Sequence, residues 1–215
     1  MDILEIMEKR HSVRQYKDIK IDDDIKNDLT IFINKINDEN NLHLQLFFNE
    51  PTAFNTMMAH YGKFEGVSNY LALIGKDEER LGYFGELFSL HLTSLGLHSC
   101  FVALTYGKRK VKWIKEKGEK LYCVISFGHG KNKGFAHKNK PLEKLVKIIG
   151  DKPDFLDRGI KACMLAPTAI NQQKFLIISD NGKISIKING KGFYTKMDLG
   201  IIKCHFELAT NIKVN

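Results

Sequence analysis

Cationic and hydroxyl side chains gather in one short segment near the start of the chain, Arg10-His11-Ser12-Val13-Arg14. Arg10 can bind a phosphate monoester through two parallel N–H bonds, and Ser12 and His11 can add further donors. In an extended segment Arg14 points to the same side as Ser12, so it could reach past a phosphate to another part of a ligand. The alternative is a solvated helix end, where cations favour the negative end of the helix dipole.

A turn of small residues near the end of the chain is the second candidate. It reads Ala166-Pro167-Thr168-Ala169-Ile170-Asn171 and precedes an apolar strand pattern. Pro167 fixes its backbone, and Thr168 and Asn171 offer donors and acceptors. With so little bulk, the backbone could approach a flat ligand closely. An ordinary helix-to-strand loop would have the same composition.

Lys138 and Lys140 alternate in extended spacing, so they could converge on an anion or could simply be surface lysines. Other constellations are poor: the chain has no Walker loop, no dinucleotide fingerprint and no pair of cysteines with zinc-like spacing. We therefore expect no metal. No residue demands a protein nucleophile or general base, which fits chemistry carried by a cofactor.

The composition limits the classes of partner and compartment. The net charge of +8 suggests anionic partners, but the lysines are scattered among Asp and Glu, so a solvated surface explains most of the excess. We expect no nucleic acid and no membrane, since no apolar run approaches roughly 20 residues. The acidic start disfavours a secretory signal, and four widely spaced cysteines suit buried thiols in a reducing cytosol. The expected location is cytoplasmic.

Hydrophobic periodicity predicts the elements that must position these segments. A first helix pattern over residues 3–7 ends at Arg10, and an internal echo relates residues 85–93 to residues 197–209. Further helices are expected over residues 24–36, 82–98, 110–117, 141–149, 155–165 and 198–210. Strands are expected over residues 42–48, 70–74, 121–127 and 175–179, followed by a hairpin turn at 180–182 and the alternating Ile184, Ile186 and Ile188.

The two turns together resemble the signatures of the FMN-dependent nitroreductase family. Residues 6–16 resemble its opening, residues 94–104 the end of its central helix and the next strand, residues 125–143 its last core strand and basic pair, and residues 162–177 its Ala-Pro-Ser-x-x-Asn-x-Gln-Pro-Trp segment. Here the second turn follows the basic pair, which resembles the compact "putative nitroreductase" branch. Gln173-Lys174-Phe175 and Thr168 depart from the usual Gln-Pro-Trp and Ser.

The resemblance implies an α+β fold with a mixed sheet flanked by helices, built as a single-chain pseudo-dimer. Residues 1–150 would form the first half, on the flavin phosphate side, and residues 151–215 would supply the partner-type turn. The protein would then be a monomer or a homodimer. FMN would be held at its phosphate by Arg10, His11, Ser12, Lys138 and Lys140. Its ring would meet Arg14 as an electrostatic stabiliser, the backbone of Ala103, Leu104 and Thr105, and the turn residues Pro167, Thr168, Ala169 and Asn171.

The implied activity is FMN-dependent oxidation of NADH or NADPH, with hydride passing through flavin N5 to a nitroaromatic or quinone acceptor. No protein residue would be catalytic in the strict sense, because the cofactor carries the hydride. Two alternatives remain open at this point: a flavin-binding sensor or store without turnover of NAD(P)H, and a basic nucleic-acid-binding module.

Overall fold

The computed structural model describes residues 2–214, which divide into two compact units. The central unit comprises residues 10–76 and 88–135. The carboxy-terminal unit comprises residues 2–9, 77–87 and 136–214. Helix α4 (Glu78–Ser94) therefore contributes its first part to one unit and the remainder to the other.

The central unit is built on a four-stranded antiparallel sheet in the order β1-β2-β4-β3. Its strands are β1 (Gln45–Phe47), β2 (Asn69–Gly75), β3 (His98–Val102) and β4 (Lys120–Gly128). All of β2 is buried, and so is most of β4, because both are central strands with apolar side chains on each face. Helix α2 (Asp23–Asn40), the short α3 (Met57–Tyr61) and the 3-10 turn η1 (Lys108–Lys110) complete the unit.

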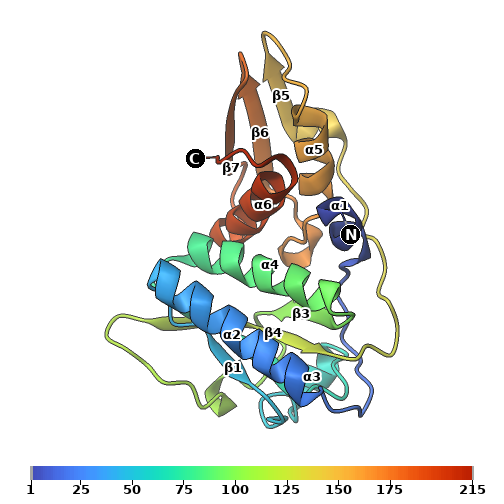
Figure 1. Ribbon diagram of the computed structural model, residues 1–215, viewed down its shortest axis with the longest axis vertical. Coiled ribbons are helices and arrows are strands. Elements are labelled where there is room, and N and C mark those ends of the chain that lie inside the picture. Colours follow the sequence, from blue (N-terminus) through green and yellow to red (C-terminus); the bar gives the residue numbers. More distant parts are fainter. Residues whose placement is uncertain (1, 215) are drawn as a thin grey trace. The chain divides into compact units, whose positions relative to one another are not determined.

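The carboxy-terminal unit contains a three-stranded sheet in the order β5-β6-β7 (Figure 1). Strands β5 (Val146–Ile149) and β6 (Phe175–Asp180) are parallel, whereas β6 and β7 (Lys183–Ile188) form an antiparallel hairpin. The helices are α1 (Ile3–Lys9), α5 (Leu156–Leu165) and α6 (Thr195–Thr210), with 3-10 turns η2 (Leu142–Lys144) and η3 (Ala169–Asn171). Apolar side chains of α5 and α6, such as Leu156, Cys163 and Phe206, are buried.

Within this unit, glycines let α4 and α6 cross at very close range. A Cβ added to Gly82 would lie 2.1 Å from the carbonyl oxygen of Met197, and one added to Gly200 would lie 1.9 Å from that of Glu79. The contact is reciprocal. Gly82 lies three residues after Glu79, whose carbonyl meets Gly200, and Gly200 lies three residues after Met197, whose carbonyl meets Gly82. Only a residue without a side chain fits at either position.

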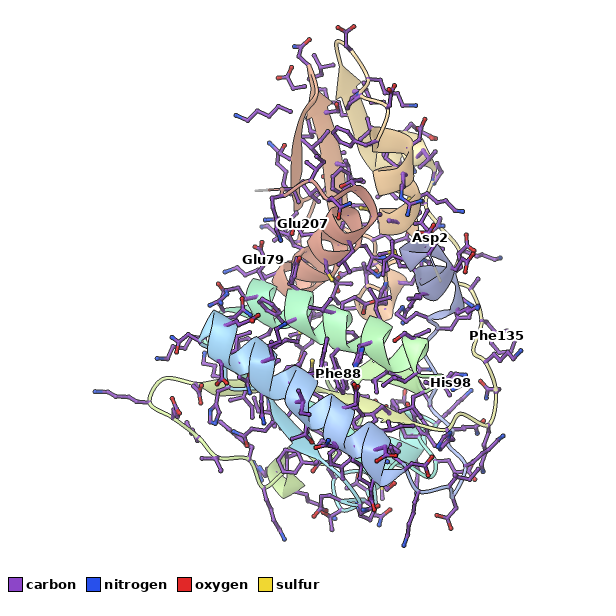
Figure 2. All side chains as sticks on the ribbon, viewed as in Figure 1. Asp2, Glu79, Phe88, His98, Phe135 and Glu207 are labelled. Atoms are coloured by element: carbon purple, nitrogen blue, oxygen red, sulfur yellow. The ribbon has the colours of Figure 1, made fainter. Side chains whose placement is uncertain are left out.

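Polar pairs connect the same two helices. His205 of α6 and Glu86 of α4 are both fully buried, and their Nε2 and Oε1 atoms are 2.8 Å apart. Towards the surface, Lys203 pairs with Glu79 at 2.6 Å, and the Tyr83 hydroxyl donates to Glu207 at 2.9 Å; Figure 2 labels both carboxylates. Apolar burial and two kinds of polar contact therefore hold this crossing together.

The predicted α+β class is confirmed, and most of the long elements lie where the periodicity placed them. The structure confirms the opening helix, the helices beginning near 24, 155 and 198, and the strands near 70, 121, 175 and 184. The units do not coincide with the predicted division at residue 150, because β5 before that point pairs with β6 after it. The division into two flavin half-sites stays a prediction.

Two predicted helices are wrong. Residues 141–149 form η2 followed by strand β5, because the β-branched Val146, Ile148 and Ile149 pair with β6. Residues 110–117 form no helix after η1. There the Gln45 side chain accepts from the backbone N–H of Ile114 and donates to its carbonyl, so it satisfies groups that a helix would otherwise pair.

Two further elements have different boundaries, and one element was missed. The helix predicted over 82–98 runs from Glu78 to Ser94, because Asp77 accepts from its first amides and Gly96 turns the chain at φ +77°. The strand predicted over 42–48 shrinks to β1, since Asn37 bonds both backbone groups of Leu44. Helix α3 was not predicted. None of the helices within the described residues combines the length and apolar character needed to cross a membrane.

Candidate functional site

The basic opening segment is extended and forms part of the central unit. Val13 donates its backbone N–H to Ser99, and Tyr16 to Glu65. Val13 is buried while its neighbours Ser12 and Arg14 are exposed, so the side chains alternate over residues 12–14 as expected. The Tyr16 hydroxyl donates to the Val13 carbonyl at 2.6 Å, which fixes the segment from inside.

Arg10 is only 4% exposed, which is incompatible with a freely solvated helix end. Its guanidinium, with that of Arg14, acts electrostatically on the buried thiol of Cys100 in β3. Burial raises the pKa of this thiol, while hydrogen bonds from Ser12 and Arg14 and the charge of both arginines act to lower it. Three of the predicted phosphate and ring residues thus converge on one point of β3.

The segment after β3 presents backbone groups that need a partner. Within the described residues, the amides of Leu104 and Thr105 donate no hydrogen bond to the protein. Leu104 is 70% exposed, and the Thr105 side chain packs against Gly62 at the end of α3. Gly107 donates to the carbonyl of Ala53, which ties this loop to the segment before α3. The amides of Leu104 and Thr105 are therefore open to a ligand, and the contact of residues 103–105 with a flavin ring stays a prediction.

The second predicted segment, which we name the Thr168 turn (residues 167–173), lies in the carboxy-terminal unit and has an unusual backbone. Ile170, Asn171 and Gln173 adopt positive φ values of 47°, 55° and 42°. The β-branched Ile170 is a clear exception in this region, and its side chain is 94% exposed. The Thr168 hydroxyl accepts from the Gln173 amide at 3.0 Å, so its own proton remains available to donate.

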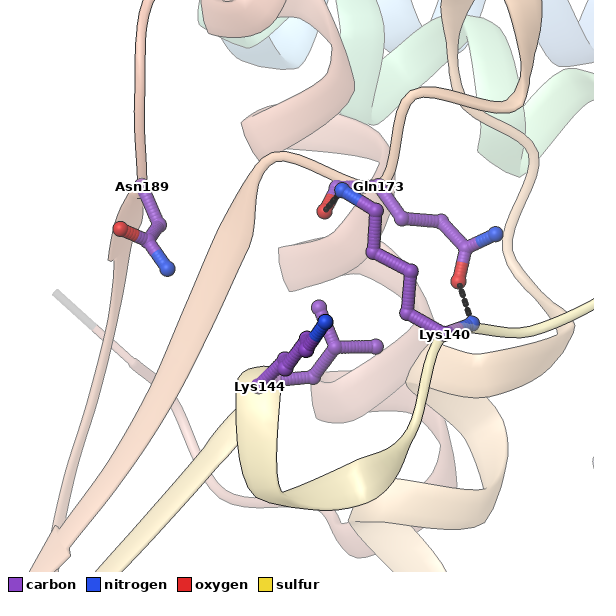
Figure 3. Close-up of a pocket in the computed structure, with 5 residues that line it drawn as sticks. Lys140, Lys144, Gln173 and Asn189 are labelled. Atoms are coloured by element: carbon purple, nitrogen blue, oxygen red, sulfur yellow. Dashed lines mark hydrogen bonds between the residues drawn. The ribbon is translucent and has the colours of Figure 1, made fainter.

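The structure brings the two predicted lysines to this turn. The Lys138 carbonyl accepts from Asn171 at 2.9 Å and from Gln173 at 2.8 Å. The Lys140 ammonium donates to the carbonyls of Gln172 at 2.6 Å and Gln173 at 3.1 Å, which leaves one of its three N–H groups. Figure 3 shows Lys140 beside Gln173, with the bond from the Lys140 backbone amide to the Gln173 side chain dashed. The lysines order the turn as well as adding charge.

Asp198 in the first turn of α6 holds the Thr168 turn from the other direction. One carboxylate oxygen accepts from the backbone amide of Ala169 at 2.8 Å, and the other accepts from the Gln172 side chain at 2.7 Å. The group is 5% exposed, and this burial raises the pKa of Asp198 to about 6, with the nearby charge of Glu78 adding to the effect.

Among the described residues, His43, Glu116 and Glu119 form a group that could hold a metal. The hydrogen bonds of the His43 ring argue against metal binding. The Gln45 side-chain amide is oriented by its two bonds to the backbone of Ile114 and presents its N–H to Nε2 of His43. Nδ1 of His43 therefore carries the proton and donates to Glu119 at 2.9 Å. Imidazole bound to a metal through Nδ1 would need the opposite tautomer.

The comparisons place this geometry in a family. Residues 2–210 match the sequence profile described as "Putative TM nitroreductase". The chain belongs to this nitroreductase family. Among solved structures, a putative nitroreductase from Thermotoga maritima is 21% identical, with 97% of this chain and 83% of that chain covered and a TM-score of 0.66.

Two further nitroreductase structures share the fold. One from Desulfovibrio desulfuricans, solved in complex with FMN, is 14% identical over 70% of this chain and 96% of that chain, with a TM-score of 0.51. A nitroreductase-like protein from Bacillus cereus is 13% identical over 67% and 94%, with a TM-score of 0.50. No curated protein matches this chain.

Sequence reasoning missed three residues around these nitroreductase segments, Cys100, Gln173 and Asp198. Asp198 had a visible signal, because an acid inside an otherwise apolar helix must find donors. The sequence also repeats part of the Thr168 turn itself: Pro51-Thr52-Ala53-Phe54-Asn55 shares four of its five residues with residues 167–171. The copies differ in use, since Phe54 is buried against Phe64 and Tyr106, whereas Ile170 is exposed.

Proposed function

We propose that this nitroreductase-family protein is an FMN-dependent oxidoreductase that uses NADH or NADPH to reduce a nitroaromatic or quinone-type acceptor. The observation that carries the proposal is the buried Arg10, which lies with Ser12 and Arg14 around one point of β3. Burial holds the guanidinium of Arg10 in a fixed orientation, and a phosphate monoester suits the planar fork of its N–H donors.

The residues present fit FMN in three respects. The cationic opening segment suits the phosphate, and the chain has no dinucleotide fingerprint that would favour FAD. The unpaired amides of Leu104 and Thr105 suit the polar edge of a ring. The Thr168 turn offers a hydroxyl proton and a backbone without bulk. FMN, when bound, would accept hydride from the nicotinamide and pass it on at N5.

The protein groups then have separate tasks. Arg10, His11 and Ser12 bind the phosphate, with Lys138 and the remaining N–H of Lys140 adding positive charge. Arg14 places its charge beside the ring, because it shares the exposed side of the segment with Ser12. The single-chain pseudo-dimer remains part of the proposal, and the reciprocal crossing at Gly82 and Gly200 supports it.

The class of acceptor is supported by exposed apolar side chains beside residues 103–105. Met57 and Tyr61 of α3 are 86% and 82% exposed, and Gly62, which caps this helix, contacts Thr105. Exposed Leu104 belongs to the same surface. Flat apolar molecules such as quinones and nitroaromatics would gain contact with these side chains.

The first experiment identifies the cofactor and the phosphate contact. Mass spectrometry of the heat-released cofactor should give FMN, and titration of the apo-protein should show flavin binding. Replacing Arg10 with Ala should weaken FMN binding by about 30- to 1000-fold, or about 2–4 kcal/mol. The matched control is Arg80→Ala, which removes the same side chain from an exposed position on α4 and should leave the affinity unchanged. Equal affinities for both variants would refute the phosphate assignment.

Turnover is a separate question from binding. Anaerobic stopped-flow mixing with NADH or NADPH should bleach the absorbance of the bound flavin, and subsequent addition of a quinone should restore it. Bound FMN that neither nicotinamide bleaches would instead identify a flavin sensor or store.

A further inference from the structure

The Thr168 turn has a backbone that it would not hold by itself. Three non-glycine residues have positive φ values, and for the β-branched Ile170 this conformation is strained. Ile170 gains no packing in return, because its side chain is almost fully exposed. The surroundings must therefore hold the turn in place.

Asp198 is the charged group that does this through two accepted hydrogen bonds. Both oxygens face N–H donors, the amide of Ala169 and the side chain of Gln172. Gln172 cannot reverse its amide at no cost, because the same nitrogen also donates to the Phe193 carbonyl at 2.7 Å. The site therefore requires two acceptor oxygens, which is what an ionised carboxylate offers.

A protonated carboxyl group fits this site poorly. Its hydroxyl is itself a donor, so one of the two N–H groups of the turn would lose its acceptor. Among the neighbouring charges, Glu78 acts on the ionisation of Asp198. Glu79 is instead paired with Lys203. The charged side chains of α5 are engaged elsewhere, Asp157 with Lys152, Arg158 with Asp2 and Lys161 with Glu8.

We propose that Asp198 is a positioning residue that orders the Thr168 turn when ionised, so that loss of its charge releases the turn and weakens FMN binding. The proposal rests on the proposed function, because it takes the turn to contact the flavin. Burial raises the pKa of Asp198 to about 6, while the hydrogen bonds from Ala169 and Gln172 act to lower it. Releasing the turn while the carboxyl group stays buried removes those bonds and raises its pKa further, so protonation favours the released turn as the pH falls through about 6.

The experiment follows the turn and the cofactor separately. In the ¹⁵N-labelled apo-protein, the amide resonance of Ala169 should titrate with a midpoint near that pKa. The dissociation constant for FMN should rise about 10- to 100-fold as the pH falls through the same midpoint. The FMN phosphate itself titrates near pH 6, so the informative quantity is the difference between wild type and variants at each pH.

Two variants isolate the role of Asp198. Asp198→Asn presents a nitrogen donor to one of the two N–H groups, so it should bind FMN about 10- to 100-fold more weakly than wild type at neutral pH. It should not unfold more easily, because removing the charge also removes its burial cost. Glu78→Gln leaves the Asp198 carboxylate in place. It should lower the midpoint of both the Ala169 titration and the FMN-binding titration, since the Glu78 charge raises the pKa of Asp198.

The outcomes separate this proposal from the proposed function. An Ala169 resonance that does not titrate, or that titrates equally in Asp198→Asn, overturns the positioning role. If Ala169 titrates but Asp198→Asn binds FMN as wild type does, Asp198 orders the turn but the flavin does not depend on it, and the proposal is wrong. Failure of the wild type to bind FMN at any pH refutes the proposed function, and the Ala169 titration still decides whether Asp198 anchors the turn.

Discussion

Replacing Glu86 with Ala should be among the most damaging single changes to the carboxy-terminal unit. His205 donates from Nδ1 to the Ala162 carbonyl at 2.9 Å, so Nδ1 carries a proton. Its Nε2 faces the Glu86 carboxyl group at 2.8 Å, and neither side chain is reached by solvent. Whichever partner holds the second proton, the pair is neutral as a whole. Without Glu86, Nε2 or its proton remains buried with no partner.

The structure sets the size of the effect. Breaking a fully buried pair by removing one partner costs about 3–5 kcal/mol. For a chain of this length, that corresponds to a fall of about 6–20 °C in the midpoint of thermal unfolding. Glu86→Gln should cost only about 1 kcal/mol, because its amide can still donate to Nε2 of a neutral imidazole.

The chain contains a matched control in the central unit. Asp28 accepts from His91 at 2.6 Å, but its side chain is 49% exposed, so Asp28→Ala should cost no more than about 1 kcal/mol. Urea unfolding followed by circular dichroism would compare the three variants. If Glu86→Ala and Asp28→Ala have the same effect, burial does not control the strength of these pairs and the reasoning is refuted.

Three further predictions concern packing and titration. Gly200→Ala should destabilise the protein by about 1–3 kcal/mol despite the better helix propensity of alanine, because its Cβ would overlap the Glu79 carbonyl; an unchanged unfolding midpoint would contradict the close crossing. A thiol reagent should label none of the four buried cysteines until denaturant is added, since burial raises the pKa of Cys100, Cys163 and Cys204; rapid labelling of the native protein would be the opposite result. Burial raises the pKa of Tyr83 to about 12 from its ordinary value of 10.0, so its contribution to stability should be intact below pH 10 and lost as the pH rises through 12. Phenolate absorbance would follow the titration, and unfolding curves at each pH would follow the stability.

The sequence predicted elements well where one periodicity extended over many residues. The opening helix and the buried strands β2 and β4 have clear patterns, and the Asn181-Gly182 turn identified the β6–β7 hairpin. Short mixed segments failed. Residues 141–149 contain apolar spacings that suit both a helix and a strand, and pairing with β6, which is distant in the sequence, decides between them.

The remaining errors occur where a side chain bonds to the backbone in place of helix or sheet pairing. The Gln45 side chain replaces helical pairing at Ile114, and Asn37 holds Leu44 out of the sheet. Gln45 lies 69 residues from Ile114, and Asn37 lies 7 residues from Leu44 across a chain reversal, so neither contact follows from the periodicity of one element. At the candidate site, residue types identified Arg10 and the Thr168 turn, but the part played by Asp198 depends on three-dimensional proximity.

The crossing of α4 and α6 also shows why a weak sequence echo was difficult to interpret. The echo rested on an acid near the start of each helix, which would align Glu86 with Asp198. The reciprocal contact instead pairs Gly82 with Gly200, and this register aligns Glu86 with Cys204. The two acids therefore occupy different positions and have different partners, His205 for Glu86 and the Thr168 turn for Asp198. A reciprocal contact is what two helices related by a two-fold axis make where they meet. The glycines, rather than the acids, are thus the residues through which this chain supports the proposal of two related halves.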